Sequence, residues 1–258
     1  MDNVNNTSNN GEEDTELIIS SLFTDMVTEV LLMHQQHLAK LNRGRVRRCR
    51  EPKIANDRWG TDIPCHHGGF YTSTDRFNPG HLVTHKWENC FTIDKHSCGY
   101  IRTSGVNDYL TIQEILYQII TTVSTGGNVL INVGPTSYGK ISPIYEERLR
   151  QMGSWLKVNG EAIYNSIPWK YQNDTINKNV WYTSSNDKQF IYACAPISSS
   201  NTSITLLGSD VGSLSWRSAG TSGGIVIELS NIKICSLASN WAWVFKLQNV
   251  TPKQTNEK

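Results

Sequence analysis

The sequence predicts an α/β region of parallel β/α units, followed by a small β-sandwich and preceded by an extra N-terminal helix. Between residues 53 and 166, short apolar segments alternate with amphipathic helical segments, which is typical of parallel β/α units. After Pro168 the pattern changes to short strand-like segments separated by turns, as in a sandwich. We therefore divide the chain into residues 1–52, 53–166 and 167–258.

The first 52 residues differ in character from the rest. Residues 1–15 are rich in Asn, Ser and Glu, a composition that predicts disorder. From Leu17 to Leu41, apolar residues recur every three or four positions, which predicts an amphipathic helix. Its apolar face is expected to pack on a core, with a membrane surface or a partner protein as the alternative. The polar start lacks the features of a signal peptide, and no apolar run is long enough to span a bilayer.

The region that follows opens with a predicted strand, Lys53–Asn56, and a long loop over residues 60–88 that is rich in His, Gly and aromatic residues. A second short strand is predicted at residues 91–94. The capping box from Thr111 to Glu114 predicts the start of a helix. That helix is expected to end at Gly126-Gly127 and to bury Ile115, Ile119 and Val123.

Two further elements complete this region. Residues 128–133 form a compact apolar segment that predicts a strand, stopped by Gly134-Pro135. Ser142-Pro143 predicts the next helix start, because proline is favoured at the first helical position. This helix is expected to end at Asn159-Gly160, and its predicted buried face consists of Leu149, Met152, Trp155 and Leu156.

The last part of the chain contains five predicted strands and no visible catalytic cluster. A hairpin turn is expected at Asn186-Asp187, between the first two strands. The predicted strands are residues 180–184, 190–195, 203–207, 225–229 and 241–247. A covering role over one face of the preceding region is the expected task of this sandwich.

Composition excludes some classes of function. The net charge is +1, which argues against a general electrostatic grip on nucleic acid. The basic run Arg43–Arg50 is interpreted as a solvated helix end rather than a binding patch. Six cysteines are too few to define a disulfide scaffold at this length. Eight tryptophans and ten tyrosines suit a sandwich core or a sugar-binding cleft, and the core is the favoured interpretation.

Carboxylates lie in or beside the predicted loops, with aromatic residues among them. Glycoside hydrolysis usually needs two carboxyl groups, and an aromatic ring gives a pyranose an apolar platform. Two explanations stay open at this point, a catalytic pair or ordinary loop carboxylates. The carboxylates are Asp57, Asp62, Asp75, Glu88 and Asp94, and the aromatic residues are Trp59, Tyr71 and Trp87.

The histidines offer a weaker signal. His66-His67 follows Cys65, and His81 and His85 are four residues apart. A histidine pair at that spacing can bind zinc on a helix, but Pro79-Gly80 disfavours a helix here and no matching pair follows. Hydrogen bonding by loop histidines is the favoured interpretation. The glycine pairs fit no phosphate-binding motif, so neither a metal nor a cofactor is expected.

From about Lys53 to Val250 the chain resembles the α-L-fucosidases of glycoside hydrolase family 29, above all the animal lysosomal and plasma enzymes. Matching motifs occur in the family's order along the chain. They are Asn56–Gly60 (NDRWG), His67–Tyr71 (HGGFY), Asp75–Phe77 (DRF), His85–Cys90 (HKWENC), Gly99-Tyr100 and Gly126–Pro135 (GGNVLINVGP), continuing through Asn159–Tyr164 (NGEAIY) and Val180–Ser184 (VWYTS).

This resemblance implies the C-terminal part of a (β/α) barrel followed by a β-sandwich. It also implies release of terminal α-L-fucose from glycoconjugates by a retaining mechanism, without metal or cofactor. The implied partners are fucosylated glycans or glycoproteins, the implied compartment is lysosomal or secreted, and a homo-oligomer is left open. No nucleic acid partner and no membrane span are expected.

The resemblance also implies roles for particular residues. Asp75 matches the acid/base position that we favour, and Glu88 is the alternative candidate. One of the two is expected to have a raised pKa beside the cleft, because a general acid must be protonated. Arg58 matches an arginine that reaches toward the sugar, and it completes the expected substrate-binding set with Trp59, Tyr71 and Trp87.

The sequence departs from the family pattern in three places. The Trp-Ser-Asp-Gly-like motif of the family nucleophile does not occur, residues 1–52 show no resemblance, and Cys98 stands where the family usually has Trp or Phe. We therefore expect an N-terminally incomplete barrel with little or no hydrolysis by this chain alone. A non-catalytic fucosidase-like binding or partner protein, a truncated gene product and a zinc-binding domain are the alternatives.

Overall fold

The computed structural model describes residues 55–174, 178–192, 202–218, 225–230, 232–233, 237–239 and 241–249. All of them belong to one compact unit, Arg50–Lys258. The predicted N-terminal tail, the helix at 17–41 and the basic run Arg43–Arg50 lie outside the described residues. Cys65, Cys90 and Cys98 are free thiols, and the other three cysteines also lie outside.

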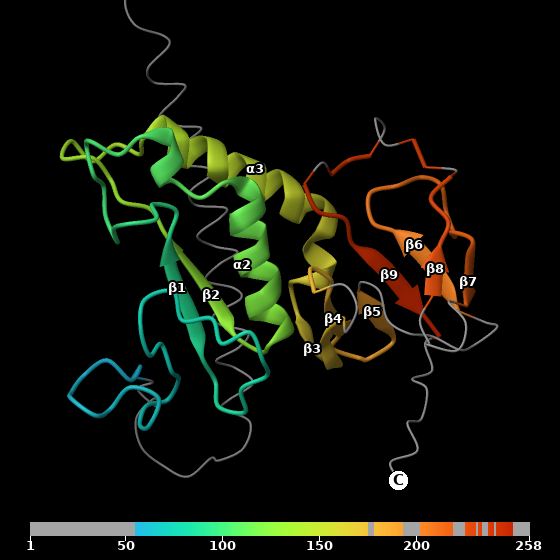
Figure 1. The fold of residues 1–258 in the computed structure, drawn as a ribbon, viewed down its shortest axis with the longest axis horizontal. Coiled ribbons are helices and arrows are strands. Elements are labelled where there is room, and N and C mark those ends of the chain that lie inside the picture. The colour runs from blue at the N-terminus through green and yellow to red at the C-terminus, as the bar shows by residue number, and fades with distance from the viewer. Residues whose placement is uncertain are drawn as a thin grey trace, which may run out of the picture. The chain divides into compact units, whose positions relative to one another are not determined.

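A parallel pair of strands with a helix between them in the chain organises the first half (Figure 1). Strands β1 (Glu88–Thr92) and β2 (Asn128–Asn132) pair in parallel, from Glu88 opposite Asn128 to Thr92 opposite Asn132. Helix α2 (Ile112–Ser124) connects them and contacts both β2 and helix α3. The predicted parallel β/α unit is therefore confirmed.

Two strand predictions in this half were wrong in position. The predicted strand at residues 91–94 begins earlier, at Glu88, and ends at Thr92. The pairing with β2 decides this boundary, because the Asn128 amide already donates to the carbonyl of Trp87 at 2.9 Å. The predicted strand at 53–56 also fails in its described part, since Ala55 and Asn56 lie outside any strand.

Both helix starts follow from their sequences. The Thr111 hydroxyl accepts from the Glu114 amide at 3.2 Å, and the Glu114 carboxylate accepts from the Thr111 amide at 2.7 Å, a complete capping box. Helix α2 ends just before Gly126, whose φ of 84° suits glycine. Helix α3 (Pro143–Asn159) starts with proline at the predicted position. A short 3₁₀ helix, η2 (Val106–Asp108), precedes α2.

The buried face of α3 differs in part from the prediction. Met152 and Trp155 are buried as expected, but Leu149 and Leu156 are only half-buried. Tyr145, which the pattern did not single out, is fully buried and lies edge to face against Tyr109, with 5.4 Å between the ring centroids. Tyrosine carries a polar hydroxyl and was not counted as apolar in the periodicity, although its ring packs in the core like any other apolar group.

The C-terminal part is rich in β-sheet. Five strands form an antiparallel sheet in the order β3-β4-β5-β9-β6, and β7 pairs with β8 in a separate two-stranded sheet. A 3₁₀ helix, η3 (Gly160–Ala162), precedes them. The strands are β3 (Ser166–Asn173), β4 (Trp181–Ser185), β5 (Phe190–Tyr192), β6 (Ser203–Leu206), β7 (Trp216–Ser218), β8 (Ile225–Ile227) and β9 (Phe245–Gln248).

The predicted strands recur here with changed ends. The hairpin turn at Asn186-Asp187 is confirmed, because β4 and β5 pair antiparallel across it. The last predicted strand, 241–247, begins only at Phe245. Strands β3 and β7 were not predicted. β3 contains Pro168 and shows no regular alternation, and β7 has only three residues, so neither gives a clear period-two signal.

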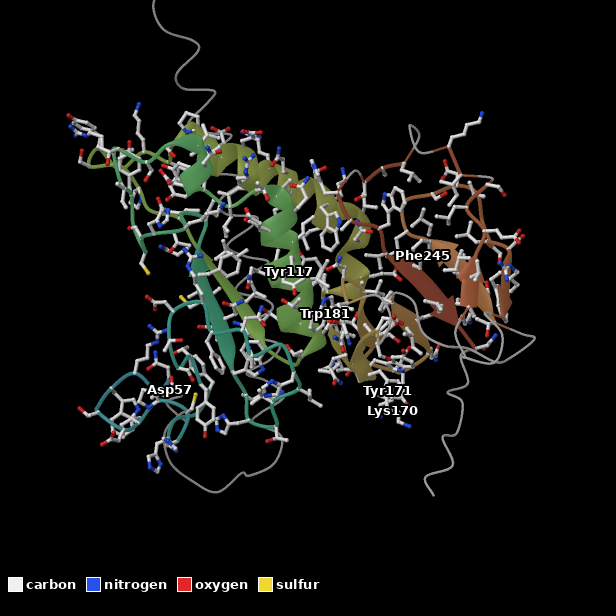
Figure 2. The ribbon with its side chains drawn as sticks, viewed as in Figure 1. Asp57, Tyr117, Lys170, Tyr171, Trp181 and Phe245 are labelled. Carbon is white, nitrogen blue, oxygen red and sulfur yellow. The ribbon has the colours of Figure 1, made fainter. Side chains whose placement is uncertain are left out.

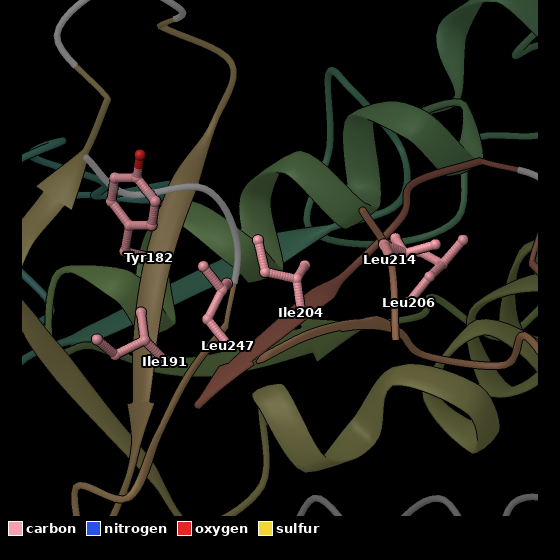
Figure 3. Close-up of a cluster of buried hydrophobic side chains, with 6 residues drawn as sticks. All are labelled: Tyr182, Ile191, Ile204, Leu206, Leu214 and Leu247. Atoms are coloured by element: carbon pink, nitrogen blue, oxygen red, sulfur yellow. The ribbon is translucent and has the colours of Figure 1, made fainter. Parts of the chain in front are cut away.

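One apolar cluster joins the strands of this part (Figure 3). Its fully buried members include Ile204 of β6 and Leu247 of β9, which lie opposite each other in the sheet register. Half-buried side chains of the second sheet, Trp216, Ile225 and Ile227, pack against the same cluster. The two sheets therefore share one core, which consists of Tyr182, Ile191, Ile204, Leu206, Leu214 and Leu247.

Several contacts attach this sheet region to the helices. Tyr117 of α2 lies edge to face with Trp181 of β4, with 6.4 Å between ring centroids (Figure 2). The Trp155 indole of α3 donates to the carbonyl of Ala242 at 2.9 Å. Lys246 of β9 forms an ion pair with Glu161 at 2.7 Å. The helices thus serve as a platform for both the parallel pair and the antiparallel sheet.

A buried carboxylate organises the loop that precedes β1. Asp57, labelled in Figure 2, has no exposed surface. Its Oδ1 accepts from the Thr72 amide at 2.8 Å and the Thr72 hydroxyl at 2.9 Å, and its Oδ2 accepts from the Cys65 amide at 2.8 Å and the Ser73 amide at 3.1 Å. Burial alone would raise the pKa of Asp57, but these hydrogen bonds outweigh it and hold that pKa below its usual value.

Asp57→Asn should therefore destabilise the protein. The amide group cannot accept on both sides, so buried donors lose their partner, at a cost of roughly 1–3 kcal/mol at neutral pH. Because the pKa of Asp57 is lowered on folding, its stabilisation is present above the unfolded-state value and is lost as pH falls through the folded-state value. Urea unfolding should show a gap between wild type and variant at neutral pH that narrows below pH 3.8. Asp62→Asn, an exposed change in the same loop, is the matched control, and equal losses in both variants would contradict the assignment.

The tight approach of Gly134 to the turn at Gly99 gives a second prediction. A Cβ at residue 134 would overlap the carbonyl carbon of Gly99 and the nitrogen of Tyr100, which are backbone atoms. Gly134→Ala should lower the free energy of unfolding by roughly 1–3 kcal/mol, since overpacking forces the backbone to shift. Gly153→Ala in α3 should instead stabilise by about 0.5–1 kcal/mol, because its Cβ would meet nothing within 4 Å. Chemical denaturation of both variants measures the difference, and a neutral Gly134→Ala would refute the packing argument.

Candidate functional site

The face of the parallel pair that points away from α2 is polar. Asn89 lies on the α2 side of β1, because its amide donates to the Thr122 hydroxyl at 2.9 Å. Side chains alternate along a strand, so Glu88, Cys90 and Thr92 occupy the opposite face. Glu88 accepts there from Asn128 Nδ2 at 2.6 Å. Thr92 likewise accepts from the Asn132 amide at 3.2 Å.

The segment of residues 71–76 lies along the edge of β1 that does not pair with β2. The Glu88 amide donates to the Tyr71 carbonyl at 2.8 Å, and the Arg76 amide donates to the Cys90 carbonyl at 2.9 Å. The Arg76 guanidinium donates to the carbonyls of Thr92, at 3.2 Å, and of Asp94. These bonds set Asp75 beside the polar face of the strand pair.

Asp75 is held between an arginine and a thiol. Arg58 Nη1 forms an ion pair with Asp75 Oδ1, and Arg58 Nε donates to the Thr72 hydroxyl at 2.9 Å. Cys98 Sγ donates to Asp75 Oδ2 at 3.4 Å. The Asp75 side chain is 56% exposed. Because Arg58 and then Cys98 donate to it, the pKa of Asp75 lies below its usual value.

The direction of this shift corrects one expectation. The general acid was expected to have a raised pKa in the free protein, whereas the pKa of Asp75 is lowered. In the free protein Asp75 is therefore an ionised carboxylate. Departure of Arg58 would raise the pKa of Asp75 and favour its protonated form.

Glu88, the other candidate, differs in its surroundings. It was expected in the loop but lies inside β1, where it is only 7% exposed. Cys90 lies on the same face of β1 as Glu88: burial raises the pKa of its thiol, the charge of Glu88 raises it further, and the charges of Arg58 and Asp75 also act on it. The fold thus brings Arg58, Asp75 and Glu88 within electrostatic reach of Cys90, from a loop, a second loop segment and a strand.

The three aromatic candidates take different positions. Trp59 is 63% exposed. Tyr71 stacks on His85 with 3.8 Å between ring centroids, so one face of its ring is covered. Trp87 is 1% exposed, and its indole donates to the Thr125 carbonyl at 3.3 Å. Trp87 is a core residue here, and of the three only Trp59 presents a large exposed ring.

The remaining carboxylates and histidines have local structural partners. Asp94 is fully buried and accepts from the amides of His96 and Ser97, at 2.7 and 2.8 Å. His85 bonds the carbonyl of Lys86, and His66 and His67 are exposed. Across the part of the chain that the structure describes, no group of three or more His, Cys, Asp or Glu side chains is arranged to hold a metal ion.

Sequence reasoning missed Asn128, Cys90 and Thr72 as members of this site. A partial signal for Asn128 was available, because residues 88, 90 and 92 of the first strand share one face, and the second strand carries Asn at both ends, 128 and 132, with Leu130 between them. Thr72 could not have been found this way, since only folding brings it to Arg58 and Asp57.

Comparison with protein families now adds to this geometry. The family model described as Alpha-L-fucosidase matches residues 20–161, and the model of the Alpha-L-fucosidase C-terminal domain matches residues 172–248. The first match begins at residue 20, inside the stretch for which no resemblance was expected. The site residues at 58, 75, 88 and 98 all lie within it.

Curated relatives agree with the family models. The plasma alpha-L-fucosidase of Rattus norvegicus is 50% identical over 219 residues, covering 78% of this chain and 47% of the relative. The tissue alpha-L-fucosidase of Homo sapiens is 42% identical over 210 residues, covering 76% of this chain and 44% of the relative. The chain therefore spans about half the length of the curated relatives it matches.

Solved structures show the same likeness in three dimensions. The alpha-fucosidase of Thermotoga maritima matches with a TM-score of 0.55 and 26% identity, over 75% of this chain and 44% of that one. The isoenzyme 1 of Paenibacillus thiaminolyticus matches with a TM-score of 0.60 over 76% of this chain and 49% of that one. At 20% identity the Paenibacillus thiaminolyticus match supports the fold alone. With a family model matched over more than half of its residues and a fold shared with solved fucosidases, this chain belongs to the α-L-fucosidase family.

Proposed function

We propose that this chain takes part in the hydrolysis of terminal α-L-fucose from glycoconjugates by a retaining mechanism. The observation that carries the proposal is the placement of Arg58, Asp75 and Glu88 at the face of the β1–β2 pair that points away from α2, within the family match. A cation and two carboxylates beside one sheet face suit the protonation and stabilisation steps of glycoside cleavage. The comparisons do not favour the non-catalytic alternatives.

The finer architecture belongs to the same proposal. Residues 53–166 are the C-terminal part of a (β/α) barrel, and residues 167–258 are a β-sandwich. The parallel β1–β2 pair with its connecting helix supports the first assignment. The shared core of the two antiparallel sheets supports the second.

We assign the acid/base role to Asp75 and keep Glu88 as the alternative candidate. In the free protein Arg58 keeps Asp75 ionised. When a sugar draws Arg58 away, the pKa of Asp75 rises, so that Asp75 can protonate the leaving oxygen and later activate water. Among the aromatic residues Trp59 has the exposure that a sugar platform needs, whereas His85 covers one face of the Tyr71 ring.

The partners and the compartment follow the family. The proposed substrates are fucosylated glycans or glycoproteins, and the proposed location is lysosomal or secreted, as the names of the plasma and tissue relatives suggest. The described helices are all too short or too polar to cross a membrane.

The acid/base role is tested by comparing two leaving groups. 4-Nitrophenol leaves without much help, whereas a sugar alkoxide needs protonation. Asp75→Asn should therefore lower kcat/KM for a fucosyl disaccharide by about 10²–10⁴-fold and for 4-nitrophenyl α-L-fucoside by much less. Release of fucose and of nitrophenol by the purified chain at mildly acidic pH gives both values.

Glu88→Gln and Asp62→Asn complete this experiment. A leaving-group effect in Glu88→Gln, absent from Asp75→Asn, would transfer the role to Glu88. Asp62→Asn should match wild type on both substrates. If the folded wild-type chain releases neither fucose nor nitrophenol, this chain alone does not hydrolyse fucosides, as the missing nucleophile motif leads us to expect. Saturable quenching of tryptophan fluorescence by L-fucose would then show whether the site still binds sugar.

A further inference from the structure

We propose that Cys98 is a positioning residue for Asp75, whose thiol holds the Oδ2 oxygen, the one that gains and loses the proton, while Arg58 holds Oδ1. The inference rests on the acid/base role proposed above for Asp75. It assigns a task to a residue that departs from the family pattern.

The two oxygens of Asp75 differ in their neighbours. Arg58 Nη1 faces Oδ1, and a guanidinium offers only donors. A proton on Oδ1 would therefore point at another donor, which leaves Oδ2 as the titrating oxygen. Cys98 Sγ is 3.4 Å from Oδ2, a normal separation for a hydrogen bond that involves sulfur.

A thiol suits both protonation states of this oxygen. With Asp75 ionised, the S–H group donates to Oδ2. With Oδ2 protonated, rotation about the Cβ–Sγ bond turns the S–H aside, and the sulfur accepts from the new O–H group, since a thiol is a weak donor and a weak acceptor. Cys98 can thus orient the proton of Asp75 as well as its charge.

The thiol is placed by elements outside the Asp75 loop. Asn132 Nδ2 at the end of β2 donates to the Cys98 carbonyl at 2.6 Å, and the Tyr145 hydroxyl of α3 donates to the Gly99 carbonyl at 3.3 Å. Gly134 packs directly against the Gly99–Tyr100 backbone. The turn that carries Cys98 is therefore fixed to β2 and α3, so the Cys98 sulfur is held at a defined position beside Oδ2 of Asp75.

The Asp75 loop has its own anchors. The Arg76 amide bonds β1, and Asn78 Nδ2 donates to Gln118 and Thr121 of α2, at 3.0 and 2.8 Å. Both partners of the Cys98–Asp75 contact are thus held independently. A contact between two independently held groups costs little ordering entropy when it forms.

The charges around Asp75 agree with this arrangement. Arg58, Cys98 and Arg76 act on Asp75 and lower its pKa, with the Arg58 hydrogen bond first and the Cys98 hydrogen bond second. The charge of Glu88 acts on the nearby Cys90 thiol and raises its pKa. Removal of the Cys98 donor should therefore raise the pKa of Asp75 even while Arg58 stays.

The test is a ¹³C-carboxyl NMR titration of Asp75 in the full chain, with its resonance identified by its loss in Asp75→Asn. Cys98→Ala should shift the titration midpoint of Asp75 upward. Cys98→Ser should keep it at or below the wild-type value, because a hydroxyl donates and accepts in the same place. An unchanged midpoint in Cys98→Ala, or equal shifts in both variants, would overturn the proposal.

Two controls separate positioning from mere structure. Cys65→Ala removes another exposed thiol, which contacts Ser73, and should leave the Asp75 titration unchanged. A purely structural role for Cys98 would lower Tm in Cys98→Ala without moving the titration. If Cys98→Ala does not fold, the Cβ shift of Cys98 in wild type should follow the Asp75 midpoint and lose that inflection in Asp75→Asn.

The titration needs no turnover, so the two proposals can fail separately. A shifted midpoint in a chain that hydrolyses no fucoside would keep the Asp75–Cys98 contact and remove its catalytic purpose. Hydrolysis with an unshifted midpoint would keep the enzymatic role and remove the positioning role of Cys98.

Discussion

The parallel register of β1 and β2 is the constraint on which the site depends. With Glu88 set opposite Asn128 and Thr92 opposite Asn132, the polar side chains of both strands face the same way. A slip of one residue would exchange the two faces and turn these groups toward the apolar side of α2. Three features help to hold that register, because they fix the length of the α2 connection. They are the capping box, the glycines at 126 and 127, and the tight packing of Gly127 on Trp87.

The carboxylates of this region show how surroundings decide the task of a residue. Asp57 and Asp94 are fully buried, and each closes a loop by accepting from backbone amides. Asp75 is exposed and is bound by two side chains, the Arg58 guanidinium and the Cys98 thiol. A carboxylate bound by backbone amides is held in place by the fold itself, whereas the pKa of one bound by side chains changes when such a partner moves. This difference, and no property of aspartate itself, separates the structural residues from the proposed acid/base residue.

A buried polar group links the site to the helix behind it. Asn89 of β1 and Asn78 of the loop both donate to Gln118 Oε1 of α2, at 3.1 and 3.0 Å. Thr121 and Thr122 accept the second hydrogen of each amide. Because buried amides require their partners, this group fixes the Asp75 loop, β1 and α2 as one piece. Arg58 and Cys98 then approach Asp75 from segments with separate anchors, so the reactive group rests on a rigid base.

The sequence by itself determined much of this protein. Helices α2 and α3 and strand β2 were predicted close to their observed bounds. Their signals, which are the capping box, the proline at the start of α3, the glycine stops and the apolar run at 128–133, act through local backbone physics. The ordered motifs from NDRWG to GGNVLINVGP predicted the family, because such motifs are recognised along the chain without knowledge of the fold. Tertiary structure alone decided the start of β1, the burial of Trp87 and Tyr145, and the lowered pKa of Asp75. Each of these depends on partners far away in sequence: the β2 register, the packing of Gly127 and Tyr109, and the approach of Arg58 and Cys98. A pattern along the chain carries no information on such pairings, because folding chooses them by packing and by the satisfaction of buried polar groups.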